Sequence, residues 1–367
     1  MKISDILAVL ELIAPSFLQE NYDNSGLVIG DKNFECSGVV LCLDATQEVV
    51  KEAIDKKCNL IIAHHPIIFS GLKKINGKNY VEQAAMLAIK NDIAIYACHT
   101  NLDNVLAGVN GKIADKLGLL DRSTLLPKEQ ALQKLTVFVP LTHLNQLEIA
   151  LFNAGAGSLG NYSECSFVSE GVGSFKPNQY ANPYSGEIGI RKTGKEMKLE
   201  VVFPVWLQQQ VVKAMKMSHP YEELAYEIST LQNQYQQIGS GLIGVLSNPM
   251  SEFDFLTFVK EQFQLKVIKH SGFTSKIIQK VALCGGAGGF LIPVAKASGA
   301  DVFLTADLKY HDFFDAEAKL LLADIGHFES EQYTIDLFYE VLQEKFPNFA
   351  LLKTGINTNP VHYFLQS

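Results

Sequence analysis

The sequence predicts an α/β protein of mostly parallel sheets with flanking helices, discontinuous along the chain and interrupted by an α+β, ferredoxin-like insert. Strand-like and helix-like segments alternate in the first third of the 367 residues and again in the last third. The strands are continuous apolar runs, which indicates parallel sheets covered on both faces. The middle of the chain instead has strands of the antiparallel type, in the order strand–helix–strand–strand–helix–strand.

We therefore expect an α/β domain over residues 1–129 and 236–367, and an inserted domain over residues 130–235. The length supports more than one domain, because a single core rarely serves more than about 250–300 residues. Two domains in simple succession are the alternative.

The N-terminal segment 1–16 has the spacing of an amphipathic helix capped near Ser4. The other elements expected in the first third are strand 38–44, helix 45–57, strand 59–66, helix 79–92, strand 93–100 and helix 108–119. Those of the last third are strand 280–289 running into a glycine loop, helix 291–299, strand 301–307, helix 311–320, strand 320–326 and helix 327–346. The insert contributes strands 134–140, 198–206 and 224–230 and helices 143–155 and 207–219.

Composition is that of an ordinary globular protein, with 47% hydrophobic and 19% charged residues. The formal net charge of −8 argues against a nucleic-acid partner, because a surface that binds nucleic acid carries an excess of basic residues. The six cysteines form no C-x-x-C pair and suggest buried, reduced thiols in a cytoplasmic protein. The N-terminus does not resemble a signal peptide, and no apolar stretch is long enough to cross a membrane.

Residues of metal-ligand type lie at or just after the ends of three predicted strands. They are His64 and His65 at the end of strand 59–66, His99 and Asp103 at and after the end of strand 93–100, and His327 and Glu331 after strand 320–326. The carboxyl ends of parallel strands are where functional groups gather in such sheets. Residues four apart at a helix start share one face, which applies to the last pair. Each histidine alone could equally be a hydrogen-bonded core or surface residue.

The doublet of His64 and His65 suggests a dinuclear metal site. On extended backbone adjacent side chains point to opposite sides, so one metal cannot easily take both rings, whereas two metals can. Glu331 or Asp103 could then bridge the two cations or neutralise them. Two metals about 3.5–4 Å apart activate a shared water as a nucleophile. Imidazole and carboxylate ligands suit Zn²⁺, Mn²⁺ or Fe.

Three further stretches allow more than one interpretation each. The glycines of "CGGAGG" (284–289) could hold a phosphate on their N–H groups or allow close packing of helix and sheet. Asp307, Lys309 and His311 could contact substrate, support the ligands from behind, or form a solvated turn. His219 could take part in the chemistry, or could only cap or join neighbouring subunits.

Several motifs together resemble the Nif-three-like family, whose bacterial members are named GTP cyclohydrolase I type 2 homologues. They are "ENYDNSGLVIG", "AHHPIIF", "CHTNLDNVLAGVN", "LCGGAGG", "TADLKYHD" and "DIGHFESE", in the family's order. The middle stretch resembles the insert of the longer members, which is similar to PII-like and CutA-like folds. Tyr22 stands where the family usually has Trp, and Ala107 where it has Gly.

The resemblance implies a dinuclear site with His64, His65, Asp103, His327 and Glu331 as ligands. It implies His65 and Asp103 on one ion, His64 and His327 on the other, and Glu331 as the bridge. The two ions per chain would be Zn, or else Mn or Fe. His99, Asp307 and His311 are expected only as supporting or substrate-contacting residues. The resemblance also implies a homohexameric ring.

The resulting functional hypothesis is a metal-dependent hydrolase, with Glu331 the residue closest to the chemistry. Its family name implies opening of the guanine imidazole ring of GTP with release of formate, and hence a nucleotide-like substrate. A non-catalytic metal-binding or regulatory ring protein is the alternative, motivated by the PII-like insert. A ring that encloses DNA is a third hypothesis, and the negative charge counts against it.

Overall fold

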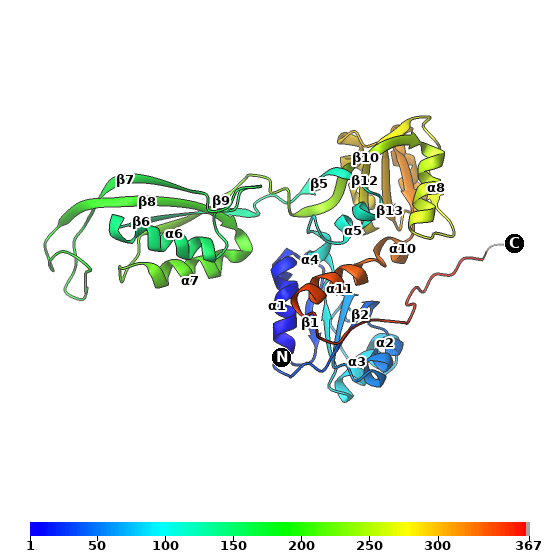
Figure 1. Cartoon of the computed structure of the whole chain (residues 1–367), viewed down its shortest axis with the longest axis horizontal. Coiled ribbons are helices and arrows are strands. Elements are labelled where there is room, and N and C mark those ends of the chain that lie inside the picture. The colour runs from blue at the N-terminus through cyan, green and yellow to red at the C-terminus, as the bar shows by residue number, and fades with distance from the viewer. Residues whose placement is uncertain (365–367) are drawn as a thin grey trace. The chain divides into compact units, whose positions relative to one another are not determined.

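The computed structural model describes residues 1–364. The chain forms two compact units, one made of Met1–Pro127 with the chain from Gln236 onward, the other of Lys128–Tyr235 (Figure 1). We describe each unit by itself.

The first unit contains a five-stranded sheet in the order β1-β4-β3-β2-β15. Its strands are β1 (Gly26–Ile29), β2 (Val39–Asp44), β3 (Leu60–His65), β4 (Ala94–Ala97) and β15 (Leu351–Lys353). All neighbours are parallel except β1, which runs antiparallel to β4. Alternate residues of each strand enter different cores, because side chains of a strand point to opposite faces.

A second, six-stranded sheet of this unit has the order β11-β14-β13-β12-β10-β5. Its strands are β5 (Leu120–Pro127), β10 (Gly239–Ser251), β11 (Lys269–His270), β12 (Ile277–Ala287), β13 (Val302–Ala306) and β14 (Leu321–Asp324). Only β12, β13 and β14 are parallel to one another, whereas β5, β10 and β11 pair antiparallel. The fold is therefore a mixed α/β fold, less uniformly parallel than the sequence predicts.

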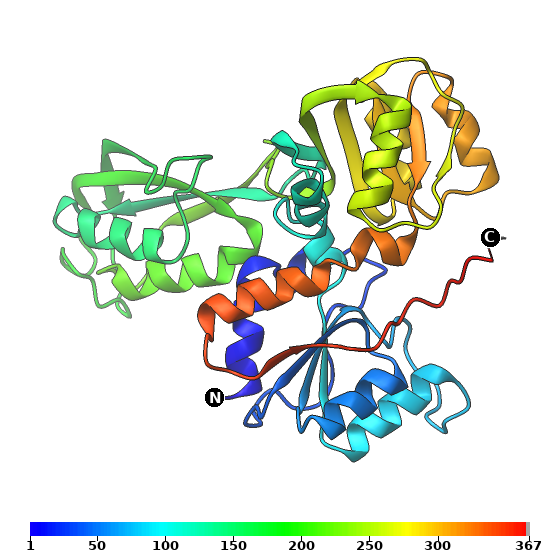
Figure 2. The same ribbon diagram turned by 45° about the vertical axis from the view of Figure 1, so that its right-hand side comes forward.

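Helices fill the space between the two sheets and cover their outer faces. They are α1 (Ile3–Ile13), α2 (Gln47–Asp55), α3 (Tyr80–Lys90), α4 (Thr100–Asp103), α5 (Val109–Lys116), α8 (Glu252–Gln262), α9 (Ile292–Ala297), α10 (His327–Glu331) and α11 (Thr334–Lys345). Buried residues of α1, α5, α8 and α11 join one face of each sheet in a single apolar core, and α11 runs between the sheets (Figure 2). Separate cores cover the outer faces. This packing fixes the two sheets to each other within the unit.

Several elements differ from the sequence predictions. The helix expected over 327–346 is broken into α10 and α11 by two turn residues. Helix α11 buries Phe338 and Leu342 in the core, whereas the buried residues of α10 are Ser330 and Glu331. The segment expected as helix 311–320 is a 3₁₀ helix, η5 (Tyr310–Ala316). Helix α1 begins at Ile3, where the Asp5 carboxylate accepts a hydrogen bond from the Lys2 N–H, so Ser4 is not its cap.

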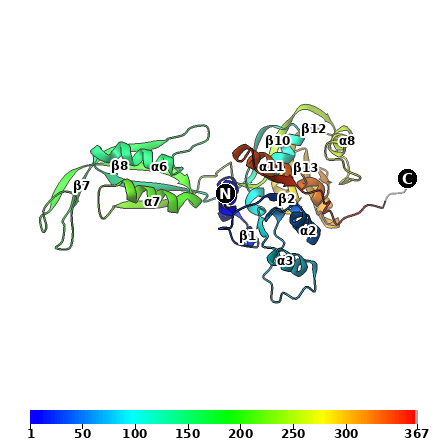
Figure 3. The same ribbon diagram turned by 60° about the horizontal axis from the view of Figure 1, so that its bottom comes forward.

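The second unit is a four-stranded antiparallel sheet in the order β7-β8-β6-β9, with two helices on one face (Figure 3). Its elements are β6 (Leu132–Val139), α6 (Leu144–Asn153), β7 (Ser166–Phe175), β8 (Lys192–Pro204), α7 (Gln208–Ser218) and β9 (Tyr226–Leu231). The helices and the inner sheet face share one apolar core. The ferredoxin-like assignment of this unit stays a prediction. In residues 1–364, the helices all fall short of the length and apolar content that a membrane crossing requires.

Candidate metal centre

The candidate metal centre lies where the carboxyl ends of strands from both sheets of the first unit meet. His64 and His65 are the last residues of β3. His99 follows β4 and directly precedes α4, whose last residue is Asp103. Helix α10 follows β14 and begins and ends with His327 and Glu331. The local sequence thus places each side chain at or near the end of a strand. The apolar core that the two sheets share brings their carboxyl-end edges together.

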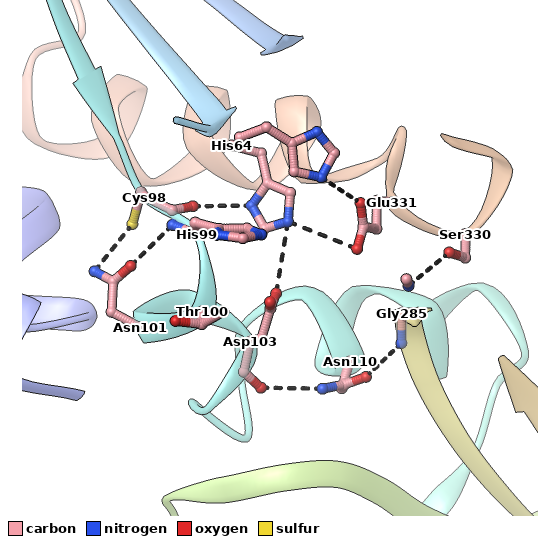
Figure 4. Close-up of polar contacts among 12 residues, drawn as sticks. His64, Cys98, His99, Thr100, Asn101, Asp103, Asn110, Gly285, Ser330 and Glu331 are labelled. Atoms are coloured by element: carbon pink, nitrogen blue, oxygen red, sulfur yellow. Dashed lines mark hydrogen bonds and ion pairs between the residues drawn. The ribbon is translucent and has the colours of Figure 1, made fainter. Parts of the chain in front are cut away.

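The first group of ligand-type atoms surrounds the ring of His64. Its Nε2 lies 3.6 Å from Oδ1 of Asp103 and 3.8 Å from Oε1 of Glu331 (Figure 4). Nε2 of His64 and Oδ1 of Asp103 are buried and form no hydrogen bond. Buried polar atoms without hydrogen-bond partners are uncommon, because leaving them unpaired costs free energy of folding. Each of these atoms therefore indicates a missing ligand or needs another explanation.

The second group surrounds the other carboxylate oxygen of Glu331. This Oε2 lies 3.0 Å from Nε2 of His65 and 3.1 Å from Nε2 of His327. The two Nε2 atoms are 3.3 Å apart. Oε2 is itself buried and forms no hydrogen bond. Glu331 therefore faces both groups, one with each oxygen.

The pairing of the histidines differs from the one that the family resemblance implies. His64 lies with Asp103, and His65 lies with His327, rather than the reverse. The prediction that the doublet's rings diverge is also wrong, since the ring centroids of His64 and His65 are only 4.8 Å apart. The strand ends at His65, so both side chains can lean over the sheet edge toward α10 instead of standing on opposite faces.

Each of the four histidines is held through Nδ1 by an acceptor behind it. Nδ1 of His64 lies 2.8 Å from the Cys98 carbonyl oxygen. The other three lie near carboxylates, with His65 2.8 Å from Asp44, His99 2.7 Å from Asp23 and His327 2.7 Å from Asp307. An Nδ1–H donated outward fixes the ring and leaves the Nε2 lone pair for a metal, which is the usual arrangement behind metal-binding histidines.

The pKa values of the clustered side chains are shifted by burial and by the charges of their neighbours. Burial lowers the pKa of His64. Burial also opposes the charged form of His65, but Asp44 and Glu331 raise its pKa to about 10. Burial, reinforced by the charge of Glu331, raises the pKa of Asp103 well above its usual range. Protons on the cluster thus neutralise the negative charge of its carboxylates in the absence of metal. A divalent cation could neutralise the same charge.

Glu331 behaves differently from its carboxylate neighbour. Burial favours its neutral form, yet the surrounding histidines hold the pKa of its carboxyl well below the usual range. The same contact with Glu331 raises the pKa of His327 to about 9, against the effect of burial. The carboxylate is therefore ionised and needs positive charge on both sides.

The glycine loop after β12 makes room for Glu331. A Cβ at Gly286, which has a φ of +61°, would overlap Oε1 of Glu331. The Gly286 N–H donates to Ser330 Oγ at 3.0 Å, and the Gly285 N–H donates to Asn110 Oδ1 at 2.9 Å. These donors are already used, so close packing explains these glycines better than a phosphate cradle does.

Two of the three supporting residues predicted from the sequence lie at the cluster, and the third does not. His99 belongs to the cluster, since His64, His65 and His99 each offer a ligand atom within 4.8 Å of the others. Asp307 orients His327, as described above. His311 is exposed and packs against the rings of Tyr310 and Phe314, so the structure does not bring it to the cluster.

Sequence reasoning missed two orienting carboxylates, Asp23 and Asp44. Asp44 is the last residue of β2, so its position at a strand end was the available signal. Asp23 lies in the "ENYDNSG" stretch and accepts hydrogen bonds from His99 and Thr100. Although burial opposes it, these contacts lower the pKa of Asp23.

A cleft of about 480 Å³ opens beside His65 and His327. Four carboxylate residues and one lysine line it together with the C-terminal segment, namely Asp44, Asp307, Asp324, Glu329 and Lys269. Lys269 is paired with Asp324 at 2.5 Å. The C-terminal segment is tied down where Thr358 donates to Asp44 at 2.6 Å. The access to this side of the cluster is thus strongly acidic.

Fold and cluster together define a class of protein, an α/β protein with two sheets and a histidine–carboxylate centre where their carboxyl ends meet. Residues 1–360 match the family described as Duf34/NIF3 (NGG1p interacting factor 3), and the chain belongs to this family. The resemblance drawn from the sequence motifs is therefore confirmed.

Relatives with names or structures support the same assignment. A "GTP cyclohydrolase 1 type 2 homolog" of Bacillus subtilis is 41% identical over 325 residues, covering 88% of this chain and 87% of the relative. One of the same name from Halalkalibacterium halodurans is 38% identical and covers 98% of this chain and 99% of the relative. The crystal structure of a Bacillus cereus protein related to NIF3 is 37% identical, with a TM-score of 0.87 and 99% coverage of both chains.

Proposed function

We propose that this protein is a metal-dependent hydrolase with a dinuclear metal site that acts on a nucleotide-type substrate. The observation that carries the proposal is the set of three buried polar atoms without hydrogen bonds, Nε2 of His64, Oδ1 of Asp103 and Oε2 of Glu331. Atoms of this kind at ligand positions fit a cation better than they fit a dry core.

One ion would be held by His64, Asp103 and Oε1 of Glu331, and the other by His65, His327 and Oε2 of Glu331. The nitrogen and oxygen donors, without a thiolate, suit Zn²⁺, with Mn²⁺ or Fe as alternatives. When bound, a pair of such ions supplies Lewis-acid activation of a water molecule at neutral pH.

The protein's own residues orient this site. Asp44 and Asp307 hold the rings of His65 and His327 through Nδ1. His99 is held by Asp23 in the same way and lies within reach of the same cluster. Gly286 leaves the space that the Glu331 carboxylate occupies.

An aromatic pair beside His99 supports a substrate with a planar base. The side chains of Tyr22 and Phe69 are 66% and 48% exposed, with ring centroids 6.4 Å apart. The ring of Phe69 lies 6.2 Å from that of His99. Exposed aromatic faces next to a polar centre can stack on a heterocycle, which fits the activity named for the relatives.

The test is turnover of GTP by the protein reconstituted with Zn²⁺, Mn²⁺ or Fe²⁺, followed by formate release and loss of the guanine spectrum. Wild type and Asp31→Asn should give product, since the Asp31 side chain contacts only its own loop around Asn33. Glu331→Gln should reduce the rate at least about 100-fold, as expected for loss of an electrostatic group at the reacting centre. Equal rates for the two variants contradict the proposal.

A non-catalytic metal-binding or regulatory protein is the second candidate. The four carboxylates that line the cleft beside His65 and His327 favour it, because Lys269 is the only Lys or Arg among the described residues of that lining and gives a triphosphate little to bind. This candidate predicts stoichiometric metal uptake without turnover of nucleotides. Measurable hydrolysis that disappears in Glu331→Gln eliminates it.

We also propose assembly as a homohexamer. Phe290 in the 3₁₀ helix η4 (Gly289–Leu291) is 62% exposed, and Tyr310 and Phe314 in η5 are 75% and 65% exposed. The rings of Tyr310 and Phe314 lie 5.5 Å apart and form an apolar surface. Clustered exposed aromatic side chains are typical of protein–protein contact surfaces.

A further inference from the structure

The inserted unit contains a cavity of its own, made entirely of residues between Phe138 and Ala225. Its volume is about 500 Å³, within the range of about 300–1,000 Å³ typical of small-molecule sites. The walls come from β6, the end of β7, the loop 176–191, β8 and the segment between α7 and β9. No residue of the metal centre takes part in it.

Aromatic side chains form part of the wall. Phe138, Phe175, Tyr184 and Tyr221 all line the cavity. The rings of Tyr184 and Tyr221 are 5.7 Å apart and tilted by 44°. Rings at this tilt can contact a planar ligand, one with its face and the other with its edge, because aromatic rings prefer offset or edge contacts with other rings.

One carboxylate of this wall, Glu196, is held in place by a tyrosine hydroxyl. The Tyr221 hydroxyl donates to its Oε1 at 2.7 Å. The other oxygen lies where the Cβ of a residue at 173 would be, so Gly173 is the residue that leaves it room. Burial raises the pKa of Tyr221, which keeps the phenol a neutral donor. Glu196 thus retains acceptor sites for a ligand on an oxygen already positioned.

His219 fixes the wall that carries Tyr221. Its Nε2 lies 2.9 Å from the Phe138 carbonyl oxygen, and the Tyr221 N–H donates to its Nδ1 at 3.1 Å. The rings of His219 and Tyr221 are 4.9 Å apart. Both ring nitrogens are therefore used within the protein, so His219 anchors the pocket and is free neither to bind metal nor to exchange protons.

The charge of the lining selects among ligands. Glu196, Glu222 and Glu223 line the cavity, against one basic residue, Lys176. An anionic ligand is disfavoured there, whereas a ligand with N–H donors gains charge-assisted hydrogen bonds. A positive charge would also be attracted by the aromatic faces.

We propose that this pocket binds a small planar molecule with an amidine-type edge, in which adjacent N–H groups face Glu196 and the ring packs against Tyr184 and Tyr221. The inference does not depend on the function proposed for the metal centre. It assigns to the inserted unit a ligand-binding role that is independent of metal.

The probes are benzamidine and benzamide, which share ring and shape but differ in the charged N–H edge. Calorimetric titration of the full chain should show one benzamidine site per chain, bound at least tenfold more tightly than benzamide. Glu196→Gln keeps an oxygen for the Tyr221 hydroxyl and should weaken benzamidine at least tenfold. Glu187→Gln, an exposed change in the loop 176–191, should leave binding unchanged.

Tyr184→Ala provides a second variant that does not threaten folding, because this side chain is 53% exposed. It should weaken both probes to a similar degree, since it removes the stacking surface and not the carboxylate. Equal affinity of wild type for the two probes, no binding of either, or equal behaviour of the Glu196 and Glu187 variants overturns the proposal.

Discussion

Oε2 of Glu331 lies 3.0 Å from Nε2 of His65, although Glu331 ends helix α10 beside the six-stranded sheet and His65 ends β3 of the other sheet. Only 3% of the Glu331 side chain is exposed. A buried carboxylate costs several kcal/mol unless positive charge compensates it. The contact therefore joins the two sheets through a group that needs cations on both sides.

Replacing Glu331 tests this requirement directly. In Glu331→Gln we expect the metal content of reconstituted protein to fall from about two ions per chain to less than one, because both groups lose a negatively charged ligand. Elemental analysis after dialysis measures this. Glu329→Gln, on the same helix, should retain the wild-type content, and a matching loss there would show that any change in α10 disrupts the site.

The pairing of the histidines makes a separate prediction. His65→Ala combined with His327→Ala should remove one ion and leave the other, since both residues belong to one group. His64→Ala combined with His327→Ala should reduce both ions, since it damages each group. Elemental analysis of the two double variants distinguishes the arrangements. The opposite order of metal content would restore the pairing implied by family resemblance.

The carboxylates that hydrogen-bond to the histidines should affect the affinity for Zn²⁺ but not the number of ions bound per chain. Asp44→Asn and Asp307→Asn should each weaken Zn²⁺ binding about 10- to 100-fold, as for other residues that orient metal-binding histidines. Competition with a chromogenic chelator gives these affinities. Asp31→Asn is the control, because Asp31 contacts only its own loop around Asn33. Unchanged affinity in both variants would mean that these hydrogen bonds do not support the metal.

Metal binding should release protons. In the metal-free state the pKa values of His65 and His327 are raised from 6.5 to about 10 and about 9, so both rings are protonated at neutral pH. Zn²⁺ must displace these protons, and its affinity should rise about tenfold per pH unit for each proton displaced. Titrations at pH 6.5 and 7.5 in buffers of different ionisation enthalpy measure both quantities.

The same shifts predict the stability of the metal-free protein. A histidine whose pKa is raised on folding stabilises the folded state below its unfolded pKa, and this contribution disappears as pH rises through the folded value. The metal-free protein should therefore lose stability between about pH 7 and 10, while the metal-loaded protein should not. Thermal unfolding of both forms across this range is the check, and parallel curves would contradict it.

The proposed hexamer predicts a particle of about six times the mass of one chain, measurable by light scattering. Phe314→Glu should give smaller particles, because it places a charge in the exposed aromatic surface with Tyr310. Tyr80→Glu, at an exposed position on α3, should not. A monomer in the wild type would remove this proposal while leaving the metal site intact.

Much of the site was predictable because it depends on local rules. Apolar strands ending in His64 and in the segment around Asp103 place these residues at sheet edges, and parallel pairing puts those edges side by side. The pairing of His65 with His327 was not predictable, because it depends on how two sheets pack around α11 and on the rotation of each ring. Asp44 is a single carboxylate at a strand end, and nothing in its spacing distinguishes it.

In the fold, too, the elements with a local sequence pattern could be predicted, and those set by distant pairing could not. The buried parallel strands followed from continuous apolar runs such as β2, whose residues are buried up to its final Asp44. The antiparallel additions were missed, since β5 alternates little and has exposed residues along one end. Its place in the sheet is set by pairing with β10, far along the chain, which leaves no local pattern.

The most direct test of the dinuclear site is a crystal structure of Zn²⁺-loaded protein with anomalous difference maps at the zinc edge. We predict two peaks per chain on either side of Glu331. One should lie about 2.0–2.2 Å from ligand atoms of His64 and Asp103 and the other at the same distance from His65 and His327. A single peak, or none at full Zn²⁺ loading, would contradict the account.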